Sequence, residues 1–331
     1  MELNNCDILL KEIENNVVLV TGATGLIGQA IVKRLVEHNV YVVAVVRDEN
    51  KAKSIFHNDK RISYITSDIN ELEIRKIKAD YIIHAAAITS SKSFVENPVD
   101  VIFTSIEGTR RTLEIARLND VKGYIYLSSM EVYGAPDNDE KINELHCSNI
   151  DTMSVRSSYP ESKRMCESLC TSYASQFGVP IKVVRLSQTF GSGVSKNDKR
   201  VFAEFARCVI EGRDIILHTK GETKRSYLHV EDAVNAILTV LLKGNTVEAY
   251  NATNENTYCS IYELAQIALN FDKNNNSKII IDVDMNDNFG YSPIMRLNLD
   301  SSKLRKLGWE PLYSLDQMFC DLISSMRMEY K

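Results

Sequence analysis

The stretch Val17-Val-Leu-Val-Thr-Gly-Ala-Thr-Gly-Leu-Ile-Gly28 decides the fold. Four apolar residues that favour strands lead into a turn with three glycines spaced G-x-x-G-x-x-G. A buried strand followed by such a turn and a helix can hold the pyrophosphate of a dinucleotide at the helix N-terminus. We expect Gly25 to let the backbone approach the phosphates and Gly28 to let the helix pack closely on the strand. The alternative is a tight turn that binds no ligand.

The chain has 331 residues, of which 44% are hydrophobic and 25% charged, as in ordinary soluble globular proteins. That length predicts one large domain or two small ones. The net charge of −5, without a basic block, argues against nucleic acid as a partner. The N-terminus has no long apolar run, so we expect no signal peptide, no membrane anchor and a cytoplasmic location. Seven scattered cysteines without a C-x-x-C pair fit a reducing compartment and predict no metal site.

Strands and helices alternate over about the first 185 residues, which predicts an α/β fold of the Rossmann type, with a doubly wound parallel sheet. The carboxyl ends of the strands would meet at one edge, where ligands bind in such sheets. The predicted strands are 17–21, 40–46, 62–66, 80–84, 122–128 and 180–186, and the predicted helices are 26–37, 105–118 and about 158–177.

The pattern changes after residue 190, where polar loops separate shorter elements. We therefore predict a dinucleotide-binding domain made of residues 1–186 together with about 226–255. Residues from about 187–225 and 256–331 would form a smaller C-terminal α/β domain that binds the substrate.

Two groups of polar residues can carry chemistry at the expected ligand edge. Tyr159 and Lys163 are four residues apart and share one face of a helix. A nearby ammonium stabilises a phenolate and lowers the pKa of the phenol, so this pair can move a proton. Ser129 ends a buried strand and can bind a substrate oxygen, and Glu131 beside it is a candidate base. Each feature alone also suits an ordinary helix face or strand end.

Together these motifs resemble the extended short-chain dehydrogenases/reductases of the nucleotide-sugar epimerase and dehydratase group. The resemblance runs from about residue 16 to 315, nearly the whole chain. Besides the glycine turn and the Tyr/Lys pair, it includes Ser67-Asp68-Ile69, His84-Ala-Ala-Ala87, Ile106-Glu-Gly-Thr109, Arg185-Leu-Ser-Gln-Thr-Phe-Gly191, Arg225-Ser-Tyr-Leu-His-Val-Glu-Asp232, Asn251 and Leu307-Gly-Trp-Glu-Pro311.

The resemblance implies a bound NAD or NADP, a nucleotide-linked sugar as substrate and a homodimer. The homodimer would use the helices at about 105–118 and 158–177. The implied cofactor-binding residues are Gly22, Thr24, Gly25, Leu26, Ile27, Gly28, Arg47, Asp68, Ile69, Ala85, Ala86 and Ala87, with Tyr159 and Lys163. The implied catalytic residues are Ser129, Tyr159, Lys163 and Glu131. The implied substrate-binding residues are Thr89, Ser129, Met130, Glu131, Gln188, Arg225 and Arg296.

Some of these roles are specific. Asp68 would meet the adenine amino group, and Arg225 and Arg296 would contact the diphosphate. Gln188 and Ser105 stand where many relatives carry asparagine.

In this group the reaction starts with oxidation of a sugar hydroxyl, usually at C4. The keto sugar can then be reduced on its other face, lose a C6 carboxylate, or lose water across C5 and C6. Met130 cannot donate a proton to a leaving hydroxyl, which disfavours 4,6-dehydration. We therefore rank 4-epimerisation first, decarboxylation second and dehydration third. A net reductase of keto-sugar nucleotides, and a cofactor-sensing protein on the same fold, are further alternatives.

The preferred dinucleotide depends on the end of the second strand. Arg47 follows that strand directly and can pair with the 2′-phosphate of NADP, which favours NADP somewhat. Asp48 lies at about the distance expected of the acid that holds the ribose of NAD. Arg47 can also be a solvated loop charge.

Overall fold

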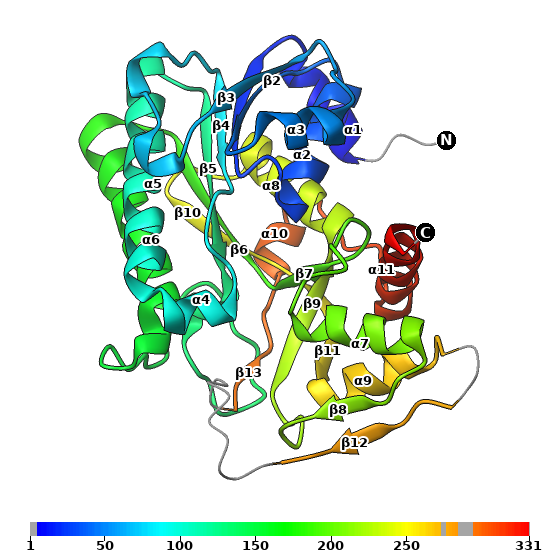
Figure 1. The fold of residues 1–331 in the computed structure, drawn as a ribbon. Coiled ribbons are helices and arrows are strands. Elements are labelled where there is room, and N and C mark those ends of the chain that lie inside the picture. The colour runs from blue at the N-terminus through cyan, green and yellow to red at the C-terminus, as the bar shows by residue number, and fades with distance from the viewer. Residues whose placement is uncertain (1–4, 273–275, 284–293, 331) are drawn as a thin grey trace.

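The computed structural model describes residues 5–272, 276–283 and 294–330. Its centre is a seven-stranded sheet with the order β10-β6-β5-β4-β1-β2-β3 and parallel pairing throughout (Figure 1). This confirms the doubly wound parallel sheet. The strands are β1 (Val17–Thr21), β2 (Tyr41–Val46), β3 (Ile62–Thr66), β4 (Tyr81–His84), β5 (Gly123–Ser129), β6 (Ile181–Leu186) and β10 (Glu248–Ala252).

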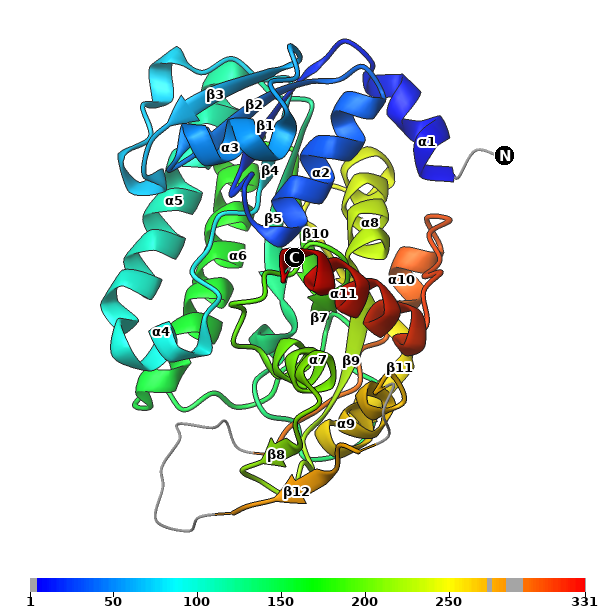
Figure 2. The same ribbon diagram turned by 45° about the vertical axis from the view of Figure 1, so that its right-hand side comes forward.

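Helices cover both faces of this sheet (Figure 2). One face carries α2 (Leu26–Glu37), α3 (Glu49–Phe56) and α8 (Val230–Lys243), with α1 (Asn5–Leu10) and the 3-10 helix η1 (Lys11–Ile13) beside α8. The other carries α5 (Pro98–Asn119), α6 (Ser158–Phe177) and the 3-10 helices η2 (Ile69–Glu71) and η3 (Ile74–Lys76).

The interior strands β1, β2 and β4 are almost entirely apolar, because both of their faces are largely buried. In β1, Val18 and Val20 join the core under α2 and α8, whereas Leu19 joins the core under α5 and α6. The same alternation in β5 sends Ile125 to the first core and Tyr124 to the second.

The large lobe differs from the predicted elements at one helix boundary, and it also contains α3, α4, α8 and β10, which were not predicted. The helix predicted from residue 105 begins at Pro98, because proline fits the first turn of a helix. A short helix, α4 (Ser91–Glu96), lies between β4 and α5 and was not predicted. Its six residues are too few to show a helical period in the sequence.

A smaller lobe holds a second sheet with the order β11-β9-β13, to which β7 is paired through β9. Its own core is built around Phe190, Phe205 and Phe319. The elements of this lobe are β7 (Gln188–Phe190), α7 (Val201–Glu211), β8 (Ile215–Leu217), β9 (Lys224–His229), β11 (Asn254–Ser260), α9 (Ile261–Leu269), β12 (Ile279–Ile281), β13 (Arg296–Leu297) and α11 (Leu315–Glu329), with β8 and β12 forming a separate parallel pair.

The C-terminal segment passes through the large lobe before it ends in the small one. Leu304, in α10 (Ser302–Arg305), and Trp309 are part of the core against the large sheet. The buried carboxylate of Asp232 on α8 accepts hydrogen bonds from the backbone N–H groups of Leu312 and Tyr313 at 3.0–3.1 Å. The segment around Trp309 thus joins the large lobe to α11. The division into two domains at the predicted boundaries stays a prediction.

Within the described part of the chain, no helix is both long enough and apolar enough to cross a membrane.

Candidate active site

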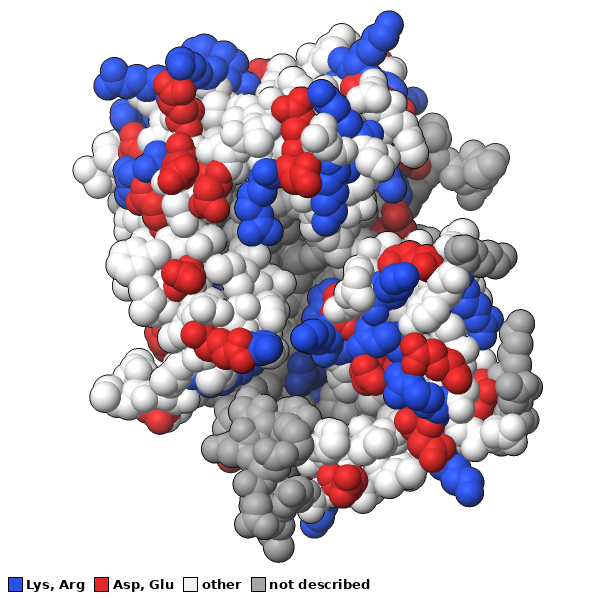
Figure 3. Space-filling view, viewed as in Figure 1, with Lys and Arg blue, Asp and Glu red and all other residues white. Residues whose placement is uncertain are grey.

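A cleft of about 1510 Å³ lies between the two lobes, at the carboxyl ends of the strands of the large sheet. The hollow is visible between the upper and lower lobes in Figure 3. All but one of the residues predicted to bind cofactor or substrate line it: Gly22, Thr24, Gly25, Leu26, Ile27, Gly28, Arg47, Asp68, Ile69, Ala85, Ala86, Ala87, Thr89, Ser129, Met130, Glu131, Tyr159, Lys163, Gln188 and Arg225. These residues are separated widely in sequence, so the fold brings them together.

The exception is Arg296. Its guanidinium forms an ion pair with Asp139 at 2.5 Å, and the residue is not part of the cleft lining. Lys224 and Tyr258 contact the same carboxylate. A role of Arg296 toward the diphosphate therefore stays a prediction that this geometry does not support.

The glycine turn is shaped by contacts within the protein. Gly22 has φ +65°, and a Cβ there would lie 2.9 Å from the backbone of Ala85 and Ala86. A Cβ on Gly28 would lie 2.1 Å from the carbonyl oxygen of Gly22, so α2 can approach the turn only with glycine at this position.

The first turn of α2 suits a phosphate group. Leu26, Ile27 and Gly28 line the cleft, and backbone N–H groups at the start of a helix have no acceptor within it. The N-cap residue is Gly25, which has no side chain to accept their hydrogen bonds. These donors and the helix dipole fit the pyrophosphate of a dinucleotide.

A buried chain of hydrogen bonds joins this turn to the next part of the cleft. The Oγ1 atom of Thr21 accepts hydrogen bonds from the N–H groups of Ala85 and Ala86, both at 3.1 Å. It therefore donates its proton to Nδ1 of His84 at 2.7 Å. Nε2 of His84 then carries the ring proton and donates it to Oγ1 of Thr109 at 3.2 Å.

The last hydrogen bond of this series fixes the donors and acceptors of the others. Thr109 donates its own hydroxyl proton to the carbonyl oxygen of Ser105 at 2.7 Å, so its oxygen accepts the proton from His84. Burial and the nearby charge of Lys163 lower the pKa of His84 to about 3, so the ring is neutral. A neutral ring with its proton on Nε2 is also what the hydrogen bonds to Thr21 and Thr109 require.

Ser129, Tyr159 and Lys163 meet at the middle of the cleft. The Nζ atom of Lys163 donates to the carbonyl oxygen of Leu127 at 2.7 Å and lies 5.7 Å from the centre of the Tyr159 ring. The hydroxyl of Ser129 accepts a hydrogen bond from the N–H group of Glu131 at 3.3 Å, which caps the 3-10 helix η4 (Met130–Tyr133). Burial lowers the pKa of Lys163 to about 8.

The pKa of Tyr159 is raised, which differs from the lowering expected from Lys163. Burial is the main cause, and the negative charge of Glu131 adds to it. A hydrogen bond with Ser129 and the charges of Arg156 and Arg200 act in the opposite direction. With these protein groups alone, the phenol is protonated at neutral pH.

Glu131 is not a free base. Its carboxylate pairs with both terminal nitrogens of Arg156, at 3.1 and 3.2 Å. Arg156 belongs to the 3-10 helix η5 (Val155–Ser157), which leads directly into α6. Arg156 lies just before the predicted helix at about 158–177, and it was given no role from sequence; its position three residues before Tyr159 was the available signal.

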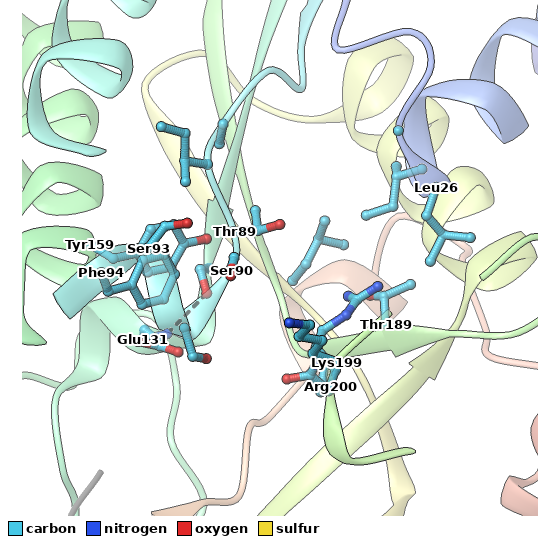
Figure 4. A pocket seen from close by; sticks show the side chains of 18 of the residues that line it. Leu26, Thr89, Ser90, Ser93, Phe94, Glu131, Tyr159, Thr189, Lys199 and Arg200 are labelled. Atoms are coloured by element: carbon cyan, nitrogen blue, oxygen red, sulfur yellow. Dashed lines mark hydrogen bonds between the residues drawn. The ribbon is translucent and has the colours of Figure 1, made fainter. Parts of the chain in front are cut away.

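Lys199 and Arg200 lie on the opposite side of the cleft from Tyr159, and Arg225 on β9 of the small lobe also lines the cleft. Figure 4 shows Lys199 and Arg200 across from Tyr159 and Glu131. Arg225 lies 3.5 Å from Oε1 of Gln188, and its buried Nε atom has no hydrogen-bond partner among the described residues. Sequence reasoning missed Lys199 and Arg200, because basic residues in a polar loop look like solvated charges.

Three other predicted residues have defined environments. Met130 is 3% exposed and packs in a cluster with Leu297, although it also touches the cleft. Asp48 caps α3 by accepting the N–H group of Lys51 at 3.0 Å. Asp68 accepts the N–H group of Asn70 at 2.9 Å and is exposed to the cleft.

Residues 18–253 match the model of the NAD dependent epimerase/dehydratase family. The chain belongs to this family. UDP-glucuronic acid decarboxylase 3 of Arabidopsis thaliana is 30% identical to it, over 90% of this chain and 85% of the relative. UDP-glucuronic acid decarboxylase 1 of Danio rerio is 28% identical, over 93% of this chain and 72% of the relative. The structure of UDP-glucose 4-epimerase from Thermotoga maritima has the same fold, with a TM-score of 0.84, 22% identity and coverage of 95% and 100% of the two chains.

Family membership confirms the resemblance given by the motifs, and makes the chain an enzyme of an NAD-dependent family. The cleft wall fits a dinucleotide in two respects. The glycine turn and residues 85–87 allow close approach of the backbone, and the first turn of α2 offers N–H donors for the pyrophosphate.

The neutral state of His84 predicts a pH-dependent contribution to stability. Because its pKa falls from 6.5 in the unfolded chain to about 3, its contribution is complete above pH 6.5 and is lost as the pH falls toward 3. His84→Gln should therefore be destabilised most at pH 7, and its deficit in unfolding free energy should shrink by about 1 kcal/mol or more by pH 5.

Urea unfolding of both proteins at each pH measures this difference. His57→Asn is the control, because His57 is exposed and its left-handed backbone suits asparagine. A deficit for His84→Gln that stays constant between pH 7 and 5 would contradict the assignment.

Proposed function

We propose that the chain is a decarboxylase of nucleotide-linked uronic acids that works through a transient 4-keto sugar. The observation that carries the proposal is the ion pair of Arg156 and Glu131 in the cleft that contains Tyr159. The planar fork of a guanidinium matches a carboxylate in shape and charge. A C6 carboxylate could replace Glu131 on the same donors, and the relatives named as UDP-glucuronic acid decarboxylases support this substrate class.

Bound NAD would supply the hydride acceptor for C4 and return the hydride at the end of the cycle. Tyr159 would take the proton of the C4 hydroxyl, with Ser129 sharing the hydrogen bond. The basic side chains Lys199 and Arg225 would bind the diphosphate from the other lobe.

Oxidation at C4 makes the C6 carboxylate part of a β-keto acid. Loss of carbon dioxide then passes the electron pair of the C5–C6 bond toward the C4 oxygen, where Ser129 and Tyr159 would stabilise the charge by hydrogen bonds. Glu131, once its ion pair with Arg156 opens, would be a carboxyl group that can move a proton near C5.

This proposal reverses the first two places of the ranking made from sequence. Epimerisation of a uronic acid would use the same guanidinium to hold the C6 carboxylate, but it also needs the keto sugar to turn in the cleft. It stays the second candidate, because Ser129, Tyr159 and Lys163 are sufficient for oxidation and reduction at C4. Dehydration lacks a proton donor at position 130, where a buried thioether lies.

Mass spectrometry of the products tests the reaction. Incubation with NAD should convert UDP-glucuronic acid to a product whose mass is lower by one carbon dioxide. UDP-glucose should keep its mass under the same conditions. Arg156→Ala should raise KM for the acidic substrate at least about tenfold, since a lost charged hydrogen bond is worth about 1.5–3 kcal/mol, and Arg156→Lys should lose less. Tyr159→Phe is the inactive control.

A product of unchanged mass that elutes at a new position would instead establish an epimerase. Consumption of NADPH with a gain of two hydrogens would establish the reductase.

We propose that the cleft accepts NADP as well as NAD. Arg47 is exposed, lines the cleft and forms no ion pair among the described residues, so it is free to meet a 2′-phosphate. Arg47→Ala should weaken NADP binding about tenfold and NAD binding less than about twofold in calorimetric titrations. Equal effects on the two dinucleotides would show that Arg47 does not read the phosphate, and Lys51→Ala is the control for a lost surface charge.

We also propose a homodimer that covers the outer surface of α5 and α6. Exposed apolar side chains gather there, including Val99 at 60% and Met165 at 55% exposure. A Val99→Glu, Met165→Glu double variant should sediment as a monomer at concentrations where the unchanged chain is a dimer. Met328→Glu, which places the same charge at an exposed apolar residue of α11, should not change the assembly; a dimer that survives the double variant would rule out this surface.

A further inference from the structure

The aromatic ring of Tyr159 is covered by a residue to which no role has been given. Phe94 of α4 stacks on it, with ring centres 4.3 Å apart and planes 9° from parallel (Figure 4). Phe94 is 2% exposed and Tyr159 is 7% exposed, so water has little access to the stacked faces. Aromatic pairs contribute about 0.5–1.5 kcal/mol beyond the apolar area that they bury, because their ring quadrupoles interact.

Phe94 also contacts the ion pair beside Tyr159. The guanidinium carbon of Arg156 lies 4.7 Å from the centre of the Phe94 ring, within the range of a cation–π contact. The same guanidinium holds Glu131. One phenyl ring therefore supports both the acid–base phenol and the proposed substrate-binding cation.

The backbone of Phe94 is fixed to the helix that carries Tyr159. The hydroxyl of Ser158 donates to the carbonyl oxygen of Phe94 at 2.9 Å, and both residues are buried. Val101 packs against the two rings from α5, and Ile88 packs from the loop after β4. The ring of Phe94 therefore has little freedom to move away from Tyr159.

We propose that Phe94 is a positioning residue for the proton transfer at Tyr159, and that α4 sets the orientation of this phenol through the stack. The proposal rests on the proposed function in one respect, namely that Tyr159 exchanges a proton with the substrate. Leucine at position 94 would keep the site apolar but remove the flat face, so the phenol could rotate and water could reach it. Tyrosine would keep the flat face.

The charged and titratable groups around the phenol come from five segments. Glu131 lies on η4, Arg156 on η5, Lys163 on α6, Arg200 before α7 and Tyr126 on β5. A change at position 94 replaces none of these residues, but Phe94→Leu removes the cation–π contact of Arg156. Because the charge of Arg156 lowers the pKa of Tyr159, a loosened Arg156 would raise that pKa, so a lower pKa in the variant would report the solvation of the phenol.

Kinetics of the NAD-loaded enzyme test the positioning. Phe94→Leu should lower kcat about tenfold, the rate equivalent of a lost aromatic stack, with KM changed less than about threefold. Phe94→Tyr should restore most of kcat. Val95→Ala, at the exposed neighbouring residue of α4, should match the unchanged enzyme.

A second measurement needs no substrate, so it separates this proposal from the proposed function. Tyrosine labelled with ¹³C at Cζ, with the Tyr159 signal assigned from Tyr159→Phe, follows ionisation of the phenol by NMR. In Phe94→Leu the phenol should ionise at lower pH than in the unchanged chain, because water reaches it. An unchanged ionisation, or loss of kcat to the same extent in Phe94→Tyr, would overturn the proposal.

Discussion

The hydroxyl group of Thr21 joins the carboxyl ends of β1 and β4 where the glycine turn borders the cleft. It accepts two backbone N–H groups from the segment after β4 and donates to His84, so β1 and β4 end in one hydrogen-bonded unit. Immediately after it, Gly22 has no room for a side chain against that segment. These two constraints restrict the turn, and α2 can pack closely on it because Gly28 lacks a Cβ, which would lie 2.1 Å from the carbonyl oxygen of Gly22. The position of the N-terminus of α2, which would meet the phosphates, follows from these contacts.

The part of the cleft around Tyr159 is built from short segments that surround the start of α6. η4, η5 and α4 bring Glu131, Arg156 and Phe94 to the start of α6, where Tyr159 lies. Burial and Glu131 both keep the phenol protonated, whereas Arg156 and Arg200 favour its ionisation. The balance between these charges depends on the ion pair of Glu131 and Arg156. A ligand that opened this pair would change the ionisation of Tyr159 at the same time as it occupied the site.

Much of the large lobe could be predicted from sequence, for a physical reason. Strands buried on both faces, such as β1 and β2, appear as apolar runs, and the six predicted strands agree with the observed ones to within one residue at each end. The glycine turn and the Tyr159–Lys163 spacing are local patterns, so the residues themselves reveal them. Contacts between distant segments leave no such pattern. Phe94 looked like any apolar residue, Arg156 like part of a helix start, and Arg200 like a loop charge, because their roles depend on what the fold places beside them.

Asp232 and the segment that it holds also limit how this architecture can change. The chain leaves the large lobe after β6, returns with α8, leaves again with β11, passes back through Trp309 and ends in the small lobe with α11. The segments of the small lobe thus alternate along the chain with those of the large one, so recombination of gene segments cannot exchange the small lobe as a unit. Within this family fold, a new sugar specificity has to arise by replacing side chains where they stand on the cleft wall. Relatives can then share a backbone and still differ in the reaction that they catalyse.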